Sequence, residues 1–137
     1  MIKFGDIRDA FFFVSSAAYG MHSAFLRKDT GQILYRSEMA DIDEIGDEDL
    51  DWDAYIEIPH KNDLDLGQRL VFDFIESHLP DEYHHVRQLF RRPGAYGRFK
   101  GFLELKGLLE SGYAFEHQRE EQALRQWCEE NEIALSD

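Results

Sequence analysis

The sequence predicts an α+β fold in a single domain, residues 1–137. Three observations predict it: helical periodicity near the N-terminus, apolar alternation with a period of two between residues 23 and 59, and helical periodicity from residue 63 onward. Strands that precede a run of helices, rather than alternate with helices, are typical of α+β folds. We therefore expect an N-terminal helix, a small three-stranded antiparallel sheet and a C-terminal group of about four helices.

The N-terminal helix is predicted from apolar residues at spacings of three and four, which are Phe4, Ile7, Phe11, Val14 and Ala18. Gly20 is expected to end this helix. Phe12 and Phe13 lie beside the apolar stripe and make it wider than one core face needs. Two interpretations stay open: these two side chains pack against the sheet, or they form the interface of a homodimer.

Residues 23–37 are predicted to form a β-hairpin. Asp29-Thr30-Gly31 supplies a turn former and a glycine that is able to adopt a positive φ. A third strand is expected over residues 54–59, where apolar and polar residues alternate until Pro59 closes the strand. These strands form the predicted sheet, with one buried face.

Residues 38–53, which we call the acidic segment, contain nine acidic residues in sixteen positions and no basic residue. Like charges at this density resist packing, so we expect an exposed loop with room for one helical turn. The spacing excludes an EF-hand. A calcium loop that begins at Asp41 has Trp52 at the twelfth position, where glutamate is required, and one that begins at Asp47 has Trp52 at the glycine position.

The C-terminal half is predicted to form four helices. Asp63 or Asp65 is expected to cap the first helix, and Pro80 suits the first turn of the second. Ser111-Gly112 is expected to end the third helix. The apolar positions that predict the four helices, in chain order, are Leu66, Leu70, Phe74; Tyr83, Val86, Leu89; Phe99, Phe102, Leu103, Leu109; and Phe115, Ala123, Leu124, Trp127, with Ile133 and Leu135 folding back after the last.

Composition limits the classes of partner. The chain has 28 acidic and 15 basic residues and a net charge of −13, so its long-range field repels nucleic acid and anionic membranes. The apolar run at residues 10–18 is too short for a membrane span, and no net basic region precedes it as in a signal peptide. The single cysteine, Cys128, cannot form an internal disulfide and is expected to be a small core residue. We therefore expect a cytoplasmic protein with no membrane contact.

One stretch carries a charge opposite in sign to the net charge of the chain. Residues 83–103 contain no acidic residue and five cations, and Pro93-Gly94 predicts a corner between two helices there. We call residues 91–100 the basic corner. Backbone N–H groups at the start of the following helix, together with nearby guanidinium groups, would favour an anion. The candidate contact residues are Arg91, Arg92, Tyr96, Arg98 and Lys100.

Two interpretations of the basic corner stay open. The acidic segment, or Glu116, Glu120 and Glu121, neutralises it internally, or it contacts an external acidic protein or small anion such as phosphate or a carboxylate. In the external case, reversing the charges of Arg98 and Lys100 is expected to remove binding and to leave the thermal midpoint nearly unchanged.

No motif for catalysis, a metal or a cofactor is present, and we expect no cofactor. "GAYGRFKG" fits neither G-x-G-x-x-G nor G-x-x-x-x-G-K-[ST], no histidine pair has the i, i+4 spacing, and no G-x-S-x-G elbow exists. His84 and His85 are expected to be exposed helix residues. The leading hypothesis is a non-enzymatic binding or regulatory domain. The alternatives are a small enzyme acting on a phosphorylated or carboxylated substrate at the same corner, and a nucleic-acid-associated protein.

The C-terminal half resembles a known family. "GAYGRFKGFL" (94–103) and "YAFEHQREEQALRQWCEENEI" (113–133) are similar to uncharacterised protein family (UPF) 0158, a set of small bacterial proteins, as are "DTGQILY" (29–35) and "YIEIP" (55–59). The resemblance covers most of the chain from about residue 23. It implies a shared domain but no activity and no catalytic residue. The matching positions are Gly94, Ala95, Tyr96, Arg98, Phe99, Lys100, Phe115, Arg119, Ala123 and Trp127.

Overall fold

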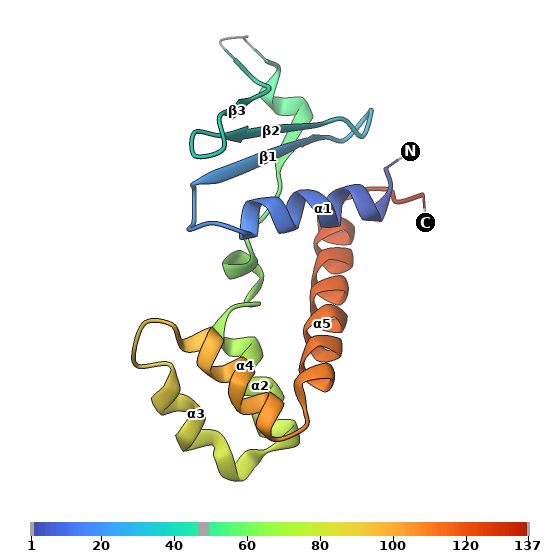
Figure 1. The fold of residues 1–137 in the computed structure, drawn as a ribbon. Coiled ribbons are helices and arrows are strands. Elements are labelled where there is room, and N and C mark those ends of the chain that lie inside the picture. Colours follow the sequence, from blue (N-terminus) through green and yellow to red (C-terminus); the bar gives the residue numbers. More distant parts are fainter. Residues whose placement is uncertain (1, 47–49, 137) are drawn as a thin grey trace. The chain divides into compact units, whose positions relative to one another are not determined.

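A computed structural model describes residues 2–46 and 50–136 (Figure 1). It confirms the α+β prediction, with four strands in place of three. The elements are α1 (Phe4–Ser15), β1 (His22–Arg27), β2 (Ile33–Ser37), β3 (Ile42–Asp43), β4 (Tyr55–Glu57), α2 (Gln68–His78), α3 (Tyr83–Leu89), α4 (Ala95–Leu105) and α5 (Leu109–Glu130). Short 3₁₀ turns occupy Trp52–Ala54, Lys61–Leu64 and Pro80–Glu82.

The chain divides into two compact units, which are described separately. Unit 1 contains Met1–Leu64 and Glu121–Asp137, and unit 2 contains Asp65–Glu120. Helix α5 contributes residues to both units. The expectation of a single domain over residues 1–137 stays a prediction.

Unit 1 is a four-stranded antiparallel sheet with α1 on one face (Figure 1). The strand order is β3-β2-β1-β4, and the predicted hairpin turn is present, with Gly31 at a φ of +81°. Ala24 and Leu26 of β1 are fully buried, as are Ile7 and Ala10 of α1. The period of two in the strand and the helical period in α1 therefore direct apolar side chains into one core.

The first helix ends five residues before Gly20, at Ser15. Ser16 contributes to this difference, because its Oγ donates to the carbonyl of Phe13 at 2.7 Å. Such a local bond competes with the continuation of a helix. Ser15 Oγ accepts from the N–H of Lys61 at 3.0 Å and so joins the helix end to a distant part of the chain. Ala18, expected on the helical stripe, is consequently exposed beyond the helix.

The acidic segment contains the strand that the sequence did not predict. Ile42 and Asp43 form β3 and pair with the end of β2. Asp43 Oδ1 also accepts the N–H groups of Ile45 and Gly46, at 3.2 and 2.8 Å, which turns the chain so that Ile45 is buried. The expected helical turn is present at Trp52–Ala54. Part of the segment, residues 47–49, lies outside the described residues.

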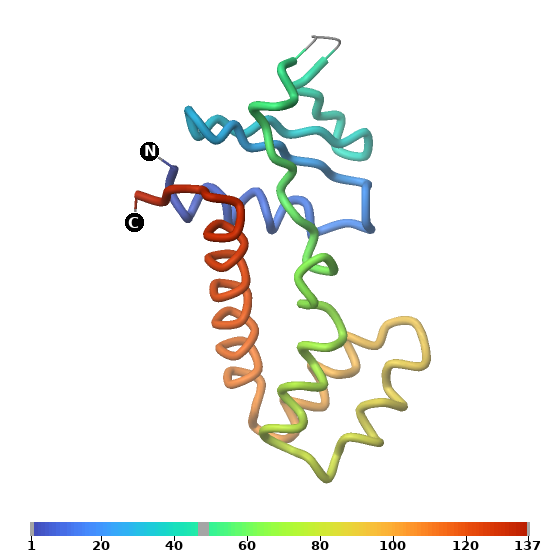
Figure 2. The backbone as a smooth tube through the Cα atoms, turned by 180° about the vertical axis from the view of Figure 1, so that it is seen from behind, coloured from blue at the N-terminus to red at the C-terminus, as the bar shows by residue number. Residues whose placement is uncertain are grey.

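The ends of the chain lie side by side in unit 1 (Figure 2). Ile2 and Leu135 form a parallel β-bridge, and Ser136 N–H donates to the carbonyl of Ile2 at 2.8 Å. Ile133 is buried, so the predicted folding back of the tail is confirmed. Cys128 is 1% exposed, and burial raises the pKa of its thiol, which confirms the prediction of a core residue.

Unit 2 has a core contributed by α2, α3 and α4. Its buried members are Val71, Phe74, Ile75, Val86, Phe99 and Leu103.

The predicted cap of α2 is absent. Neither Asp63 nor Asp65 caps this helix, which begins after Gly67 without a side-chain cap. Asp63 instead accepts the N–H of His60 at 3.0 Å, and Asp65 lies 3.9 Å from Arg69. Pro80 occupies the first turn before α3, as predicted.

The predicted helix end at Ser111-Gly112 is wrong. The break lies at Gly107, which has a φ of +70°, and α5 runs through Gly112. A Cβ built on Gly112 would lie 2.9 Å from Leu103 Cδ1, closer than real contacts of this kind. Gly112 therefore permits close packing of α5 on α4 rather than ending a helix.

Replacing Gly101 with alanine should raise the free energy of unfolding by about 0.5 to 1 kcal/mol, since alanine favours helix. Gly101 lies within α4, and a Cβ there would meet nothing within 4 Å. The matched change Gly112→Ala should give a smaller gain or a loss, because the new methyl group would displace Leu103. Urea denaturation of both variants measures the difference. Equal gains at the two positions would contradict the close packing.

Candidate binding site

The basic corner joins α3 to α4. Helix α3 ends at Leu89, α4 begins at Ala95, and Gly94 adopts a left-handed conformation with a φ of +80°. A residue with a Cβ adopts this φ only at a cost, so glycine permits the sharp turn. The predicted corner between two helices is therefore present.

Arg98 extends its guanidinium back across this turn. Nη1 donates to the carbonyl of Pro93 at 2.8 Å, and Nη2 donates to those of Leu89 and Arg92, both at 2.9 Å. The carbonyl groups at the end of a helix have no partner within the helix, so a cation that bonds to them stabilises the end. Arg98 thus fastens the end of α3 and the turn to the first residues of α4.

This geometry changes the interpretation of Arg98. Its two terminal nitrogens donate to backbone carbonyls of the corner itself, and no carboxylate is involved. The groups that bind Arg98 therefore belong to the chain itself, but they are backbone carbonyls and not the acidic side chains that the internal alternative named. Its replacement is consequently expected to change stability, contrary to the expectation of a nearly unchanged midpoint.

The other three cations of the corner are more exposed than Arg98, which is half-buried. Arg91, Arg92 and Lys100 are exposed, and none forms an ion pair within residues 2–46 and 50–136. Lys100 Nζ lies 5.7 Å from the centre of the Tyr113 ring, a cation–π distance. These three side chains can therefore receive an external anion without breaking an existing ion pair.

Tyr96 adds an aromatic surface to the corner. Its side chain is 44% exposed, and its ring meets the Phe90 ring edge-on at 5.1 Å. Partial burial raises the pKa of Tyr96, and the charge of Glu116 adds to this effect. The hydroxyl is therefore neutral at physiological pH and is able to donate a hydrogen bond. Tyr96 and Lys100 are four residues apart on α4 and share one face of the helix.

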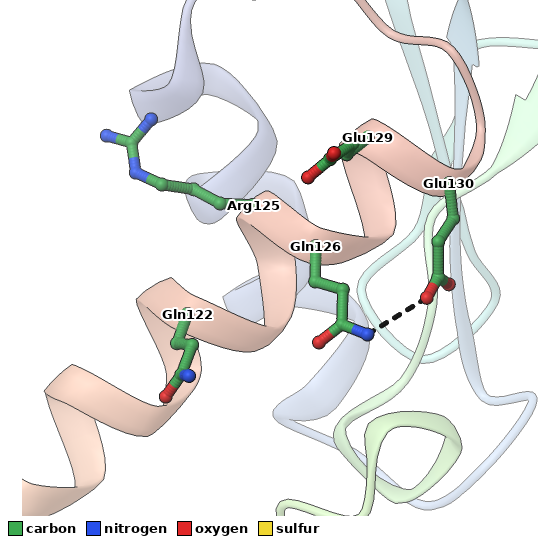
Figure 3. Close-up of a pocket in the computed structure, with 5 residues that line it drawn as sticks. All are labelled: Gln122, Arg125, Gln126, Glu129 and Glu130. Carbon is green, nitrogen blue, oxygen red and sulfur yellow. Dashed lines mark hydrogen bonds between the residues drawn. The ribbon is translucent and has the colours of Figure 1, made fainter.

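A hollow on the surface of α5 in unit 1 is a poorer candidate (Figure 3). All five residues that line it come from this one helix: Gln122, Arg125, Gln126, Glu129 and Glu130. Gln126 Nε2 donates to Glu130 Oε1 at 3.0 Å, and the Arg125 guanidinium lies 4.1 Å from the centre of the Phe4 ring. Polar groups from a second element do not converge on this surface, so it lacks the character of a ligand site.

The sequence analysis missed a polar cluster around His60. This histidine is 4% exposed, and its Nε2 bonds to the carbonyl of Ala17 at 2.9 Å while Nδ1 accepts the N–H of Asn62 at 3.1 Å. Because a carbonyl only accepts, Nε2 carries the hydrogen. The Tyr19 ring lies 5.5 Å from the His60 ring, and a hydrogen bond with Asp63 raises the pKa of Tyr19. Both ring nitrogens are occupied, so the cluster is structural.

Within residues 2–46 and 50–136, the other histidines and the acidic residues form no cluster of the kind that holds a metal ion. No group of three or more histidine, cysteine, aspartate or glutamate side chains in the described part of the chain could hold a metal ion. His84 and His85 are exposed on α3, as predicted. His78 stacks on Phe74 at 4.2 Å.

Comparison with known proteins adds no assignment. No protein-family model matches the chain, and no curated protein and no solved structure matches it either. Among the described residues, none of the helices is both long enough and apolar enough to cross a bilayer. The candidate site is thus defined by its geometry alone.

Proposed function

We propose that this protein is a small, non-enzymatic binding or regulatory domain that contacts an acidic protein surface or an anion through the basic corner. One observation carries the proposal. In a chain with 28 acidic residues, Arg91, Arg92 and Lys100 are exposed and form no ion pair in the described part of the chain. Their positive charge is therefore available to an external anion or acidic surface.

The backbone beneath these cations supports the proposal. Arg98 holds the carbonyls of Leu89, Arg92 and Pro93, so Arg91 and Arg92 extend from a turn with a defined conformation. A preorganised surface loses less conformational entropy when it binds. Tyr96 and Tyr113, which are 44% and 41% exposed, supply the aromatic contacts that are enriched at interfaces.

No observation favours the enzyme or the nucleic-acid alternative over this proposal. We also propose, from the sequence alone, that the protein functions in the cytoplasm and belongs to UPF 0158. The support for that family is the set of residues named above around Gly94-Ala95-Tyr96.

The double variant Arg91→Glu/Arg92→Glu tests the proposed function. Binding of a fluorescein-labelled polyglutamate peptide at low ionic strength should weaken at least tenfold, because two attractive charges become repulsive. The thermal midpoint should stay close to that of the wild type, since both side chains are exposed. Fluorescence anisotropy measures the affinity, and circular dichroism measures the midpoint.

The matched control is Lys3→Glu/Arg8→Glu, which makes the same change in net charge at two exposed positions of unit 1. This control should bind the peptide within about threefold of the wild type, because it makes the same change in net charge and leaves every side chain of the corner in place. Equal loss in both variants would show that net charge, rather than the corner, determines binding. Absence of binding by the wild type would also contradict the proposed function for an acidic peptide.

A further inference from the structure

The acidic segment carries charges that complement the basic corner. Four of its described acids, Glu38, Asp41, Asp51 and Asp53, are exposed and form no ion pair within the described residues. Asp43, in contrast, lies 3.6 Å from Arg36 within the sheet. The chain therefore presents a second set of exposed and unneutralised charges, of the sign opposite to that of the corner.

The two surfaces also complement each other in their apolar groups. Met39 is 67% exposed and Trp52 is 46% exposed within the acidic segment. Trp52 is held in place, because its ring contacts Phe25 at 5.1 Å and Tyr55 at 5.9 Å. Tyr96 and Tyr113 lie beside the cations of the corner. Aromatic residues, methionine and arginine are the side chains enriched at protein interfaces.

From this complementarity we infer that the partner of the basic corner is a second copy of this chain, which docks Asp51, Trp52 and Asp53 against Arg91, Arg92 and Lys100. The inference rests on the proposed function of the corner. The contact joins two different surfaces, so in a pair one copy retains a free acidic segment and the other retains a free corner. Such heterologous contacts extend into open chains or close into rings.

Electrostatics sets the conditions for this association. Two copies with a net charge of −13 repel each other at long range, but salt screens that repulsion beyond about 8 Å at physiological ionic strength. Ion pairs in direct contact are screened less. Association is therefore expected to be weak, to rise with protein concentration and to fall at high salt.

Two variants in a mixing experiment test the inference. Arg91→Glu/Arg92→Glu destroys the corner and keeps the acidic segment, whereas Asp51→Lys/Asp53→Lys reverses two acids beside Trp52 and keeps the corner. Sedimentation velocity at 20 to 500 μM, about the range expected for a weak complex, should show the wild type above monomer mass. Each variant alone should stay monomeric. An equimolar mixture should form a complex of two chains and no larger species, because only one intact pair of surfaces remains.

Three results would overturn the inference. A wild type that is monomeric throughout, while it binds polyglutamate through Arg91 and Arg92, would remove self-association and leave the proposed function intact. A dimer that persists in both variants would place the contact elsewhere. A mixture that stays monomeric would exclude the head-to-tail pairing even if the wild type associates. Unchanged thermal midpoints of both variants are the control for folding.

Discussion

Replacing Phe11 with alanine should lower the free energy of unfolding by about 3 to 5 kcal/mol, the range for the loss of a buried aromatic side chain. Phe11 is 1% exposed and lies on α1, between the fully buried Ile7 and the buried Val14. The change removes the buried ring and leaves a cavity that neighbouring side chains fill only in part. Guanidinium denaturation followed by circular dichroism measures the loss.

Phe12→Ala is the matched control, since it removes the same ring from the next position of the same helix. Phe12 is 40% exposed, and its ring meets that of Phe11 at 6.0 Å. We expect a loss below about 1 kcal/mol for such an exposed side chain. Equal losses at the two positions would contradict the burial pattern of α1.

Phe12 also bears on the homodimer that the sequence suggested. Phe13 stacks on His22 at 4.5 Å and meets Tyr35 edge-on at 5.1 Å, so it packs against the sheet of its own chain. That packing leaves Phe12 as the more accessible of the two rings. A dimer through Phe12 stays a proposal, and the sedimentation experiment above distinguishes it, because neither charge variant would disrupt it.

The fold was predictable where the periodic pattern of apolar residues extends over several helical turns or over a whole strand. The stripe of α1 and the alternation in β1 are long enough to be seen in the sequence. Strand β3 has only two residues, Ile42 and Asp43, and no period is visible over that length. Gly112 shows a second limit, because a glycine that ends a helix and one that permits close packing look alike until the neighbouring Leu103 is known.

The candidate site was predictable only as a region. The absence of acids from Tyr83 to Leu103 and the Pro93-Gly94 pair indicated a cationic corner, and the structure contains that corner. The sequence could not show that Arg98 has a different role from Arg91 and Arg92. The groups that bind Arg98 are backbone carbonyls, which every residue has, so no residue type reveals them. His60 was missed for the same reason, because its partners are also backbone groups.

Arg98→Ala should lower the free energy of unfolding by about 2 to 3 kcal/mol, since hydrogen bonds to charged groups contribute more than neutral ones. The variant loses three bonds and leaves the carbonyls of Leu89, Arg92 and Pro93 without this donor. Water replaces part of the lost hydrogen bonding to these carbonyls, because the corner is only partly buried. Urea denaturation measures the change.

Two further variants separate the charge of Arg98 from its shape. Arg98→Lys keeps the positive charge, but a single ammonium cannot reach three carbonyls in the geometry of the guanidinium fork, so most of the loss should remain. Arg91→Ala removes an exposed arginine of the same corner and should change stability by less than about 0.5 kcal/mol. If Arg98→Ala left the stability unchanged and abolished peptide binding instead, Arg98 would face the partner, and the distinction between the arginine that shapes the corner and those that bind would be wrong.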